Sequence, residues 1–332
     1  MAPLQGICRA HTNIALIKYW GKRDQDLILP MNSNLSLTLD RFYTDTEVHF
    51  SSDFTSDRLI LNDTLQEEAE TQRISQFLDH FRAYAGTSLK AQVTSYNHVP
   101  TAAGLASSAS AFAALAGACN QALALGLDLT TLSRFARLGS GSATRSIFGG
   151  FVEWQKGTGD KDSIALPFDD AQWDIGMIII ALNKKQKAIS SREGMAHAMA
   201  TSPFYSLWPT LSKEKLAAIK PAIKAHDLQK IGEIAEHHAM MMHATTLSAN
   251  PPFSYFEPET LVAIQAVHQI RQSGIPAYVT MDAGPNVKVL CHYSDADRIM
   301  VKLQDHFPSD QLIASKPGQG IQLLDHLEAL HA

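Results

Sequence analysis

The chain has 332 residues, of which 45% are hydrophobic and 18% charged, and its formal net charge is −5. This composition is typical of a folded protein of one or two domains and excludes a disordered chain. The acidic balance argues against nucleic acid or an anionic membrane as the main partner.

Cysteine usage and apolar runs indicate the compartment. The three cysteines lie far apart in the sequence and none forms a CxxC motif, which fits a reducing cytosol without disulfides or a zinc knuckle. The N-terminus lacks the apolar core of a signal peptide. The apolar run at 174–182 is too short to span a membrane, and the run at 110–127 is interrupted by Asn120 and Gln121. The sequence therefore predicts a cytoplasmic protein.

Periodicity in the first half predicts alternating strands and helices. The most regular helix is expected at 66–85, where apolar residues recur at helical spacing and Gly86 ends the pattern. Strands are expected at 46–52, 57–62, 90–99 and 174–182, helices at 112–125 and 129–139, and a helical turn leading into a strand at 142–157.

The second half is richer in helix. Helices are expected at 193–200, 212–247 and 261–272, and strands at 276–282, 286–293 and 310–315. Ser294 is expected to cap a last helix, with Asp297 three residues further on, that runs to about Phe307. From 174–182 onward the order is β–α–β–β–α–β, the split βαβ pattern, which places a domain boundary near 170–185.

Several common motifs are absent from the sequence. It has no GxxxxGK loop followed by Ser or Thr, and no GxGxxG, HExxH or GxSxG. Their absence argues against P-loop NTPases, Rossmann dehydrogenases, zincins and α/β-hydrolases. Four other polar constellations remain.

The first constellation is the small-residue turn PTAAGLASSASA at 100–111. Gly104 lets the backbone approach an anion, and helix N-terminal amides with the hydroxyls of Ser107 and Ser108 can donate to phosphate or bind a metal. The lysine of a Walker loop is missing. The same small residues also suit a helix packed tightly on a sheet, and the sequence alone leaves both interpretations open.

The second and third constellations are HTNIALIKYWGKR at 11–23 and GSGSATR at 139–145. Lys18, Lys22 and Arg23 beside two aromatic residues suit an anionic ligand with an apolar part, although a partly buried strand with snorkelling lysines fits as well. In the third, Arg145 can pair with a carboxylate or phosphate. The alternative is a helix end followed by a helix start with Arg145 at the surface, but the many small polar residues favour a functional role.

The fourth constellation combines VTMDAGPN at 279–286 with KKQKAISSR at 184–192. Asp282 follows an apolar strand, and the second segment concentrates positive charge. The structural alternative for Asp282 is a turn cap, and the alternative for the basic segment is a solvated loop. A possible metal pair, Glu233 and His237 in EIAEHHAMMMH, lacks a signalled third ligand, so the methionine run there is expected to form core or pocket wall.

Taken in order, five segments resemble the diphosphomevalonate decarboxylase family, within the superfamily of galactokinase, homoserine kinase, mevalonate kinase and phosphomevalonate kinase. The resemblance covers most of the chain, and the combination of KYWGK, SGSATR and DAGPN is more specific than any single motif. The segments are HTNIALIKYWGKRDQDLILPMNSNLSLTL, PTAAGLASSASAFAALA, GSGSATRSIFGGFVEW, SSREGM and TMDAGPNVKVL.

The resemblance implies an α+β fold in two domains, residues 1–172 and 173–332, with the active site between them. The first domain would be ribosomal-protein-S5-like and the second a ferredoxin-like split βαβ domain. It further implies a homodimer that uses Mg-ATP to convert (R)-5-diphosphomevalonate to isopentenyl diphosphate, ADP, phosphate and carbon dioxide. ATP and Mg²⁺ are thus the expected cofactors.

The resemblance also assigns roles to residues that match the family's motifs. Asp282 is the catalytic carboxylate near the C3 hydroxyl, Lys18 lies beside it, Arg145 holds the substrate carboxylate, and Asn13 is a partner of that arginine. The expected substrate-binding residues are Tyr19, Trp20, Gly21, Lys22, Arg73, Ser140, Gly141, Ser142, Ala143, Thr144, Arg145, Ser191, Arg192 and Thr201. The expected ATP-binding residues are Ala103, Gly104, Leu105, Ala106, Ser107, Ser108 and Lys187, with Ser107 also a candidate Mg²⁺ ligand.

Three alternatives stay open. A monophosphate-specific decarboxylase and a mevalonate 3-kinase belong to the same superfamily, and a catalytically silent nucleotide-binding or scaffold protein is a different class. The third motif reads DAGPN where the superfamily's kinases are usually glycine-rich, which argues against a simple kinase. Asp282 together with Arg145 favours decarboxylation. Whether Asp282 acts as a base or mainly orients the hydroxyl is also open, because phosphoryl transfer is largely dissociative.

Overall fold

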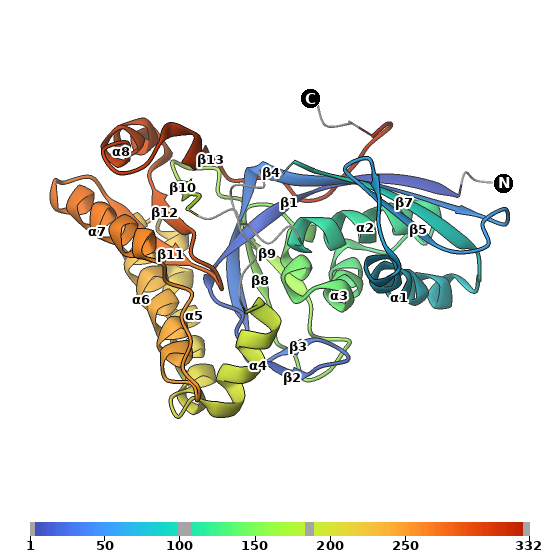
Figure 1. Cartoon of the computed structure of the whole chain (residues 1–332), viewed down its shortest axis with the longest axis horizontal. Helices are drawn as coiled ribbons and strands as arrows, with labels where there is room; N and C mark the ends of the chain where they lie inside the picture. Colours follow the sequence, from blue (N-terminus) through green and yellow to red (C-terminus); the bar gives the residue numbers. More distant parts are fainter. Residues whose placement is uncertain (1–3, 99–107, 183–188, 328–332) are drawn as a thin grey trace.

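A computed structural model describes residues 4–98, 108–182 and 189–327. Its elements form two lobes side by side, each built on its own sheet (Figure 1). We call the eight-stranded sheet with helices α1–α3 the N-terminal lobe, and the four-stranded sheet with helices α5–α8 the C-terminal lobe. The α+β class expected from the sequence is confirmed, whereas the division of the chain at residue 172 stays a prediction.

The N-terminal sheet is built on two long antiparallel strands, β1 (Gln5–Ile17) and β4 (Asn34–Ser51). The main order is β14-β1-β4-β7-β5-β6, and β8 pairs with both β4 and β9. The last described strand therefore crosses back from the other lobe to pair with β1. The other strands are β5 (Arg58–Leu61), β6 (Thr64–Leu65), β7 (Lys90–His98), β8 (Phe151–Trp154), β9 (Ala165–Asp169) and β14 (Gln322–Leu323).

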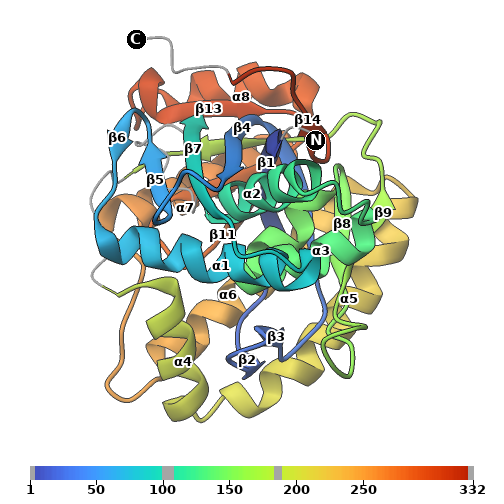
Figure 2. The same cartoon turned by 90° about the vertical axis from the view of Figure 1, so that its right-hand side faces the viewer.

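Three helices lie against the N-terminal sheet (Figure 2). They are α1 (Glu68–Ala85), α2 (Ser108–Ala122) and α3 (Leu129–Gly139). The alanine-rich α2 packs closely on β1, since a Cβ atom on Gly117 would lie 2.3 Å from Cys8 Sγ. Tight packing, one of the two interpretations of the small residues, therefore applies to the part of that segment from Ser108 onward, while residues 100–107 lie outside the described ranges.

The C-terminal sheet has the order β11-β12-β10-β13, with all neighbours antiparallel. Its four strands and the helices α7 and α8 on one face give the split βαβ arrangement, as predicted. The elements are β10 (Gly176–Ile180), α7 (Pro258–Gln272), β11 (Ala277–Met281), β12 (Val287–Cys291), α8 (Ala296–Leu303) and β13 (Leu312–Ser315).

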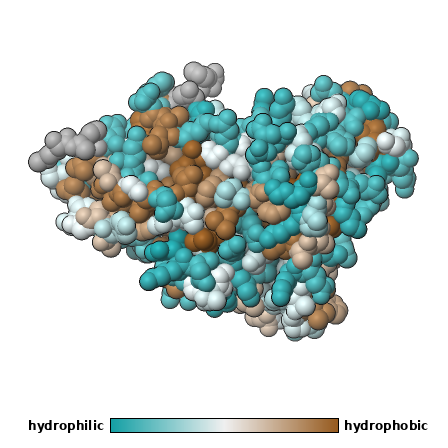
Figure 3. Space-filling model, turned by 180° about the vertical axis from the view of Figure 1, so that it is seen from behind, coloured by the Kyte–Doolittle hydropathy of each residue, from teal (hydrophilic) through white to brown (hydrophobic). Residues whose placement is uncertain are grey.

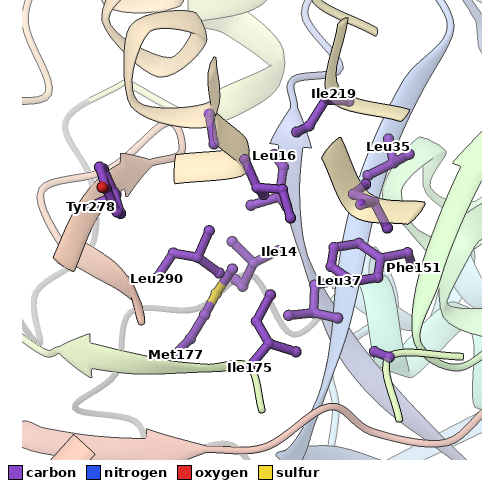
Figure 4. Packing of buried hydrophobic residues seen from close by; sticks show 14 of the residues in the cluster. Ile14, Leu16, Leu35, Leu37, Phe151, Ile175, Met177, Ile219, Tyr278 and Leu290 are labelled. Carbon is purple, nitrogen blue, oxygen red and sulfur yellow. The ribbon is translucent and has the colours of Figure 1, made fainter. Parts of the chain in front are cut away.

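A shared apolar layer joins the two lobes. Helices α5 (Trp208–Lys224) and α6 (Leu228–Leu247) cover the other face of the C-terminal sheet. Figure 4 shows Ile14 and Leu37 of the long N-terminal strands packed with Met177 and Leu290 of the C-terminal sheet. Because one core binds both sheets, residues that follow β1 and β11 are held at fixed positions next to each other.

Two expectations about helices were wrong. The predicted helix 212–247 is two helices, because the chain turns at His226, whose φ is 54°, and Asp227 begins α6 by accepting a hydrogen bond from Lys230 N. Ser294 does not cap α8, since its hydroxyl donates to Asp174 Oδ2 at 2.6 Å. Residues Tyr293–Asp295 instead form a short 3-10 helix before α8.

The surface seen from behind is mostly hydrophilic, with hydrophobic residues in several patches (Figure 3). Large exposed hydrophobic side chains include Leu65, Phe204 and Val301, which lie far apart in the sequence. Among the described helices, none combines the length and the apolar character needed to cross a membrane.

Replacing Arg82 by methionine is expected to lower the free energy of unfolding by about 3–5 kcal/mol, because Asp57 would keep a buried charge without its partner. Arg82 is 4% exposed, pairs with Asp57 and donates from Nε to Leu89 O at 2.7 Å. Urea unfolding at neutral pH measures the change. The matched control is Arg298→Met, because Arg298 is exposed and its pair with Asp295 is expected to contribute less than about 1 kcal/mol. Equal losses in both variants would contradict the prediction.

Candidate active site

A cavity of about 610 Å³ is lined by segments from both lobes. Its walls come from the end of β1 and the residues after it, from α1, from the starts of α2 and α4, and from the turn between β11 and β12. The helix α4 spans Ser191–Thr201 and begins with a capping box formed by Ser190 and Glu193. The predicted residues in this lining are Asn13, Lys18, Tyr19, Lys22, Arg73, Ser108, Ser140, Gly141, Ser142, Arg145, Ser191, Arg192 and Asp282.

Asp282 is held by two buried lysines. It follows β11 directly, and its carboxylate oxygens lie 2.8 Å from Lys18 Nζ and 3.1 Å from Lys288 Nζ. The lysine side chains are only 2% and 3% exposed, whereas that of Asp282 is 39% exposed and lines the cavity. The lysines therefore approach from the protein side and leave the carboxylate facing a ligand.

The backbone of Lys18 is fixed on both sides. Its N–H donates to His238 Nδ1 at 3.0 Å, and its carbonyl accepts from Asn32 Nδ2 at 3.0 Å. His238 Nε2 lies 3.0 Å from Ser212 Oγ. Burial and the nearby charge of Lys18 lower the pKa of His238 to about 3, so the ring is neutral at neutral pH and can accept at Nδ1. Lys18 is therefore a rigid part of the site.

Electrostatics keep Asp282 ionised. Its place inside the cavity, where little bulk water solvates it, opposes ionisation, but the charges and hydrogen bonds of Lys18 and Lys288 outweigh this effect and hold its pKa well below the usual range. Burial also lowers the pKa of Lys18 to about 8, despite the attraction of Asp282. A carboxylate with so low a pKa is a weak base and suits orientation and charge stabilisation better than proton abstraction.

Arg145 presents a buried guanidinium to the same cavity. It lies on the 3-10 helix Gly141–Ile147, and its Nε donates to Ser36 Oγ at 3.0 Å and to Asn13 Oδ1 at 3.2 Å. Its Nη1 donates to Asn34 Oδ1. All of these partners are neutral, and in the described parts of the chain no carboxylate pairs with Arg145. Burial lowers the pKa of Arg145 to about 10, so it keeps its charge at neutral pH and can receive a carboxylate from a ligand.

Three further cations gather at another part of the lining. Lys22 of the short strand β2 (Lys22–Asp24), Arg73 of α1 and Arg192 of α4 all line the cavity. Burial, and then the charges of Arg192 and Arg73, lower the pKa of Lys22. No ion pair with a carboxylate involves these three cations among the residues described. Like charges held together in this way favour a polyanionic ligand.

Hydroxyl groups also line this cavity. Ser140 Oγ lies 3.3 Å from Ser108 Oγ and 3.1 Å from Ser142 Oγ. The buried hydroxyl of Tyr19 has no hydrogen-bond partner in the described structure, and a Cβ atom on Gly141 would lie 2.8 Å from its ring. Gly141 therefore makes room for Tyr19 beside the cavity.

Some predicted site residues lie behind the cavity rather than in its lining. Trp20 is buried and donates from Nε1 to Thr245 Oγ1 at 3.0 Å. At Gly21 the φ of 112° and the close hydroxyl of Tyr205 leave no room for a side chain. Ala143 and Thr144 are buried, and Thr201 donates to His197 O. Ala103, Gly104, Leu105, Ala106, Ser107 and Lys187 lie outside the described residues.

Sequence reasoning missed Lys288 and the polar partners of Arg145 on β4. Lys288 is the one charged residue in the apolar strand VKVLC, and this isolated charge could have indicated a functional lysine. The methionine run at 240–242 was expected in core or pocket wall, and this is confirmed, since Met242 lines the cavity. For the discounted metal pair, the described residues contain no group of three or more His, Cys, Asp or Glu side chains that could hold a metal ion.

The fold and this cavity define a two-lobed α+β protein whose cation-lined cavity suits small, strongly anionic ligands. Residues 10–165 match the model of the diphosphomevalonate decarboxylase-like N-terminal domain, and residues 177–328 match that of the mevalonate 5-diphosphate decarboxylase C-terminal domain. The chain belongs to the diphosphomevalonate decarboxylase family.

Individual relatives agree along nearly the whole chain. The diphosphomevalonate decarboxylase of Bos taurus is 35% identical over 97% of this chain and 86% of its own length. The structure of mevalonate diphosphate decarboxylase from Staphylococcus aureus has a TM-score of 0.94 at 47% identity and covers 97% of this chain and 98% of its own. The structure of the enzyme from Enterococcus faecalis has a TM-score of 0.93 at 49% identity and covers 98% of this chain and 100% of its own.

Proposed function

We propose that this protein catalyses the ATP-dependent decarboxylation of (R)-5-diphosphomevalonate to isopentenyl diphosphate, with release of ADP, phosphate and carbon dioxide, as a step of the mevalonate pathway. One observation carries the proposal. Arg145, without a carboxylate partner among the described residues, faces the same cavity as the lysine-held carboxylate of Asp282. This pair can hold a substrate carboxylate and a nearby hydroxyl at the same time.

The comparisons support the substrates. Relatives 35–36% identical to this chain are named diphosphomevalonate decarboxylase. A protein that is 50% identical, with a TM-score of 0.93, has a structure described as MDDEF in complex with MVAPP, AMPPCP and magnesium. We therefore assign ATP and Mg²⁺ to this protein as well.

Each part of the substrate has a matching group in the cavity. The diphosphate would bind the cation group of Lys22, Arg73 and Arg192, with hydroxyls such as those of Tyr19, Ser140, Ser142 and Ser191 as further donors. The carboxylate would bind Arg145, which Asn13 helps to orient, and the C3 hydroxyl would face Asp282. A diphosphate prefers this arrangement over a monophosphate because several cations converge on it.

The chemistry follows from this placement. Mg-ATP supplies the phosphoryl group that turns the C3 hydroxyl into a good leaving group. When that phosphate departs, positive character grows at C3 and the electrons of the C1–C2 bond form the new double bond as carbon dioxide leaves. Asp282 orients the hydroxyl and favours the positive character at C3. Arg145 keeps the C1–C2 bond aligned with the breaking C3–O bond.

The residues present fit a metal that arrives with the nucleotide. Mg²⁺ usually takes few protein ligands and binds the phosphates and water instead. The absence of an acidic cluster from the described residues agrees with this mode. Ser108 at the start of α2 can donate to the nucleotide phosphates, and we propose that 103–107 with Lys187 complete that end of the site.

A product assay tests the proposal. The protein is incubated with Mg-ATP and either diphosphomevalonate or the 5-monophosphate, and ADP and carbon dioxide are followed together. We expect equal amounts of both products with the diphosphate and little turnover with the monophosphate. ADP without carbon dioxide would indicate a 3-kinase, and no product from either substrate would indicate a silent binding protein.

The value of kcat/KM is expected to fall as the pH rises through about 8, because Lys18 then loses its proton. Burial lowers its pKa from 10.5 to about 8, so the charged form is complete only below that pH. A profile across the neutral and alkaline range reports this group in the free enzyme. The variant Lys18→Arg stays charged, so its kcat/KM should not fall in this alkaline limb of the profile. An unchanged alkaline limb in this variant would show that another group titrates there.

The proposal extends to the assembly and compartment of the protein. We propose a homodimer in the cytoplasm with domains 1–172 and 173–332. The cysteines Cys8, Cys119 and Cys291 are buried and free, which agrees with a reducing compartment. Sedimentation equilibrium at enzyme concentrations used in the assay decides between monomer and dimer.

A further inference from the structure

We propose that Lys288 is a positioning residue of this reaction, and that it holds the second oxygen of the Asp282 carboxylate so that the first can face the substrate hydroxyl in a fixed orientation. The inference rests on the proposed function of the cavity. Nothing in the motifs that define the family resemblance assigns a role to this lysine.

The register of the β11–β12 hairpin carries the first step. Lys288 on β12 is paired with Thr280 on β11. Residues directly opposite each other in an antiparallel pair point to the same face, so Lys288 shares a face with Thr280, and Asp282 follows β11 two residues further on. Its Nζ lies 3.1 Å from Asp282 Oδ2 and donates to Asn286 O at 3.3 Å. One ammonium thus joins both ends of the turn that carries the catalytic carboxylate.

The second step concerns the two lobes. Lys18, after β1, belongs to the N-terminal lobe, whereas Asp282 and Lys288 both belong to the C-terminal lobe. The contact from Lys18 to Oδ1 therefore joins the two lobes, whereas the contact from Lys288 to Oδ2 lies within a single hairpin. Without Lys288, a single ammonium would hold the carboxylate and leave it free to rotate.

The third step concerns charge. The groups that face Lys18 are Asp282, Lys288, Arg145 of the 3-10 helix, and His238 and His243 of α6. Burial lowers the pKa of both histidines to about 3, so three cations and one carboxylate remain. The charge of Lys288 helps to lower the pKa of Lys18, and removing it should raise that pKa. The net positive charge suits a substrate carboxylate.

The test compares Lys288→Met and Lys288→Gln with the wild-type protein in the product assay. We expect kcat to fall by about 10²-fold, the loss typical of a misplaced catalytic group, with little change in the KM of ATP. The alkaline limb of kcat/KM should move to a higher pH, since Lys18 loses a neighbouring cation. Lys288→Arg should recover part of the turnover and keep the limb near its wild-type position.

The matched control is Thr280→Val, since Thr280 lies opposite Lys288 and its buried hydroxyl has no partner among the described residues. This control should keep wild-type turnover. If Lys288→Met does not fold, as judged by circular dichroism, Lys288→Gln decides. Wild-type turnover in a folded Met or Gln variant, or a lower kcat with the alkaline limb unmoved and no recovery by Arg, would overturn the inference. An inactive wild-type protein would instead reject the proposed function.

Discussion

Replacing Asp282 by asparagine is expected to lower kcat by about 10²–10⁴-fold, with little change in the affinity for ATP. Asparagine keeps the size of the side chain but removes the charge that both buried lysines face. The C3 hydroxyl would then lose its charged acceptor, and the positive character at C3 would lose its counter-charge. Because Lys18 and Lys288 would repel each other without an anion between them, the pKa of Lys18 should fall further.

The measurement follows ADP and carbon dioxide release in parallel, with the dissociation constant of ATP taken from calorimetry. The matched control is Asp297→Asn, an exposed carboxylate on α8 in the same lobe. It should turn over at the wild-type rate. If Asp282→Asn also does so, Asp282 does not have the role proposed here and another group must orient the hydroxyl.

Replacing Arg145 by glutamine is expected to lower kcat/KM for diphosphomevalonate by about 10²–10³-fold, the effect of removing one preorganised charged donor. The substrate carboxylate would lose its partner, so the C1–C2 bond would no longer be held in line with the departing phosphate. Turnover that remains should therefore release more ADP than carbon dioxide. ATP affinity should change little, because Arg145 faces the carboxylate and not the nucleotide in this proposal.

The variant Arg145→Lys separates charge from geometry. Lysine keeps the charge but cannot present the planar fork of a guanidinium to a carboxylate, so its kcat/KM should fall between those of the glutamine variant and the wild type. Urea unfolding of both variants measures how far the loss of bonds to Ser36 and Asn13 destabilises the fold. Equal release of ADP and carbon dioxide at the wild-type rate by Arg145→Gln would rule out the carboxylate clamp.

Local sequence patterns predicted many of the elements close to their observed bounds. The helix expected at 66–85 spans Glu68–Ala85, and the strand expected at 276–282 spans Ala277–Met281. In both cases the spacing of the apolar residues and the residues that end the element are local to the segment, so no distant contact is needed to predict it. Gly86 ends the helix with a φ of 67°, a conformation that glycine adopts without strain.

Features that depend on distant partners were not predictable in this way. The local sequence around Ser294 predicts a helix cap, but its hydroxyl donates to Asp174, which belongs to an earlier segment of the chain. The small polar residues of GSGSATR favoured a functional Arg145, but its particular role depended on the family resemblance. Its buried position follows from Asn34 and Ser36 on β4, which no local pattern connects to it. Lys288 acquires its partner only through the hairpin register.

The pairing of β14 with β1 also bears on how the chain folds during synthesis. Cys8 and Arg9 on β1 pair with Leu323 and Gln322 on β14, so β1 is synthesised before the C-terminal lobe and its partner strand after it. Until then that edge of β1 has unpaired backbone groups that can bind other nascent chains. The N-terminal sheet can therefore be completed only after the C-terminal lobe has been synthesised.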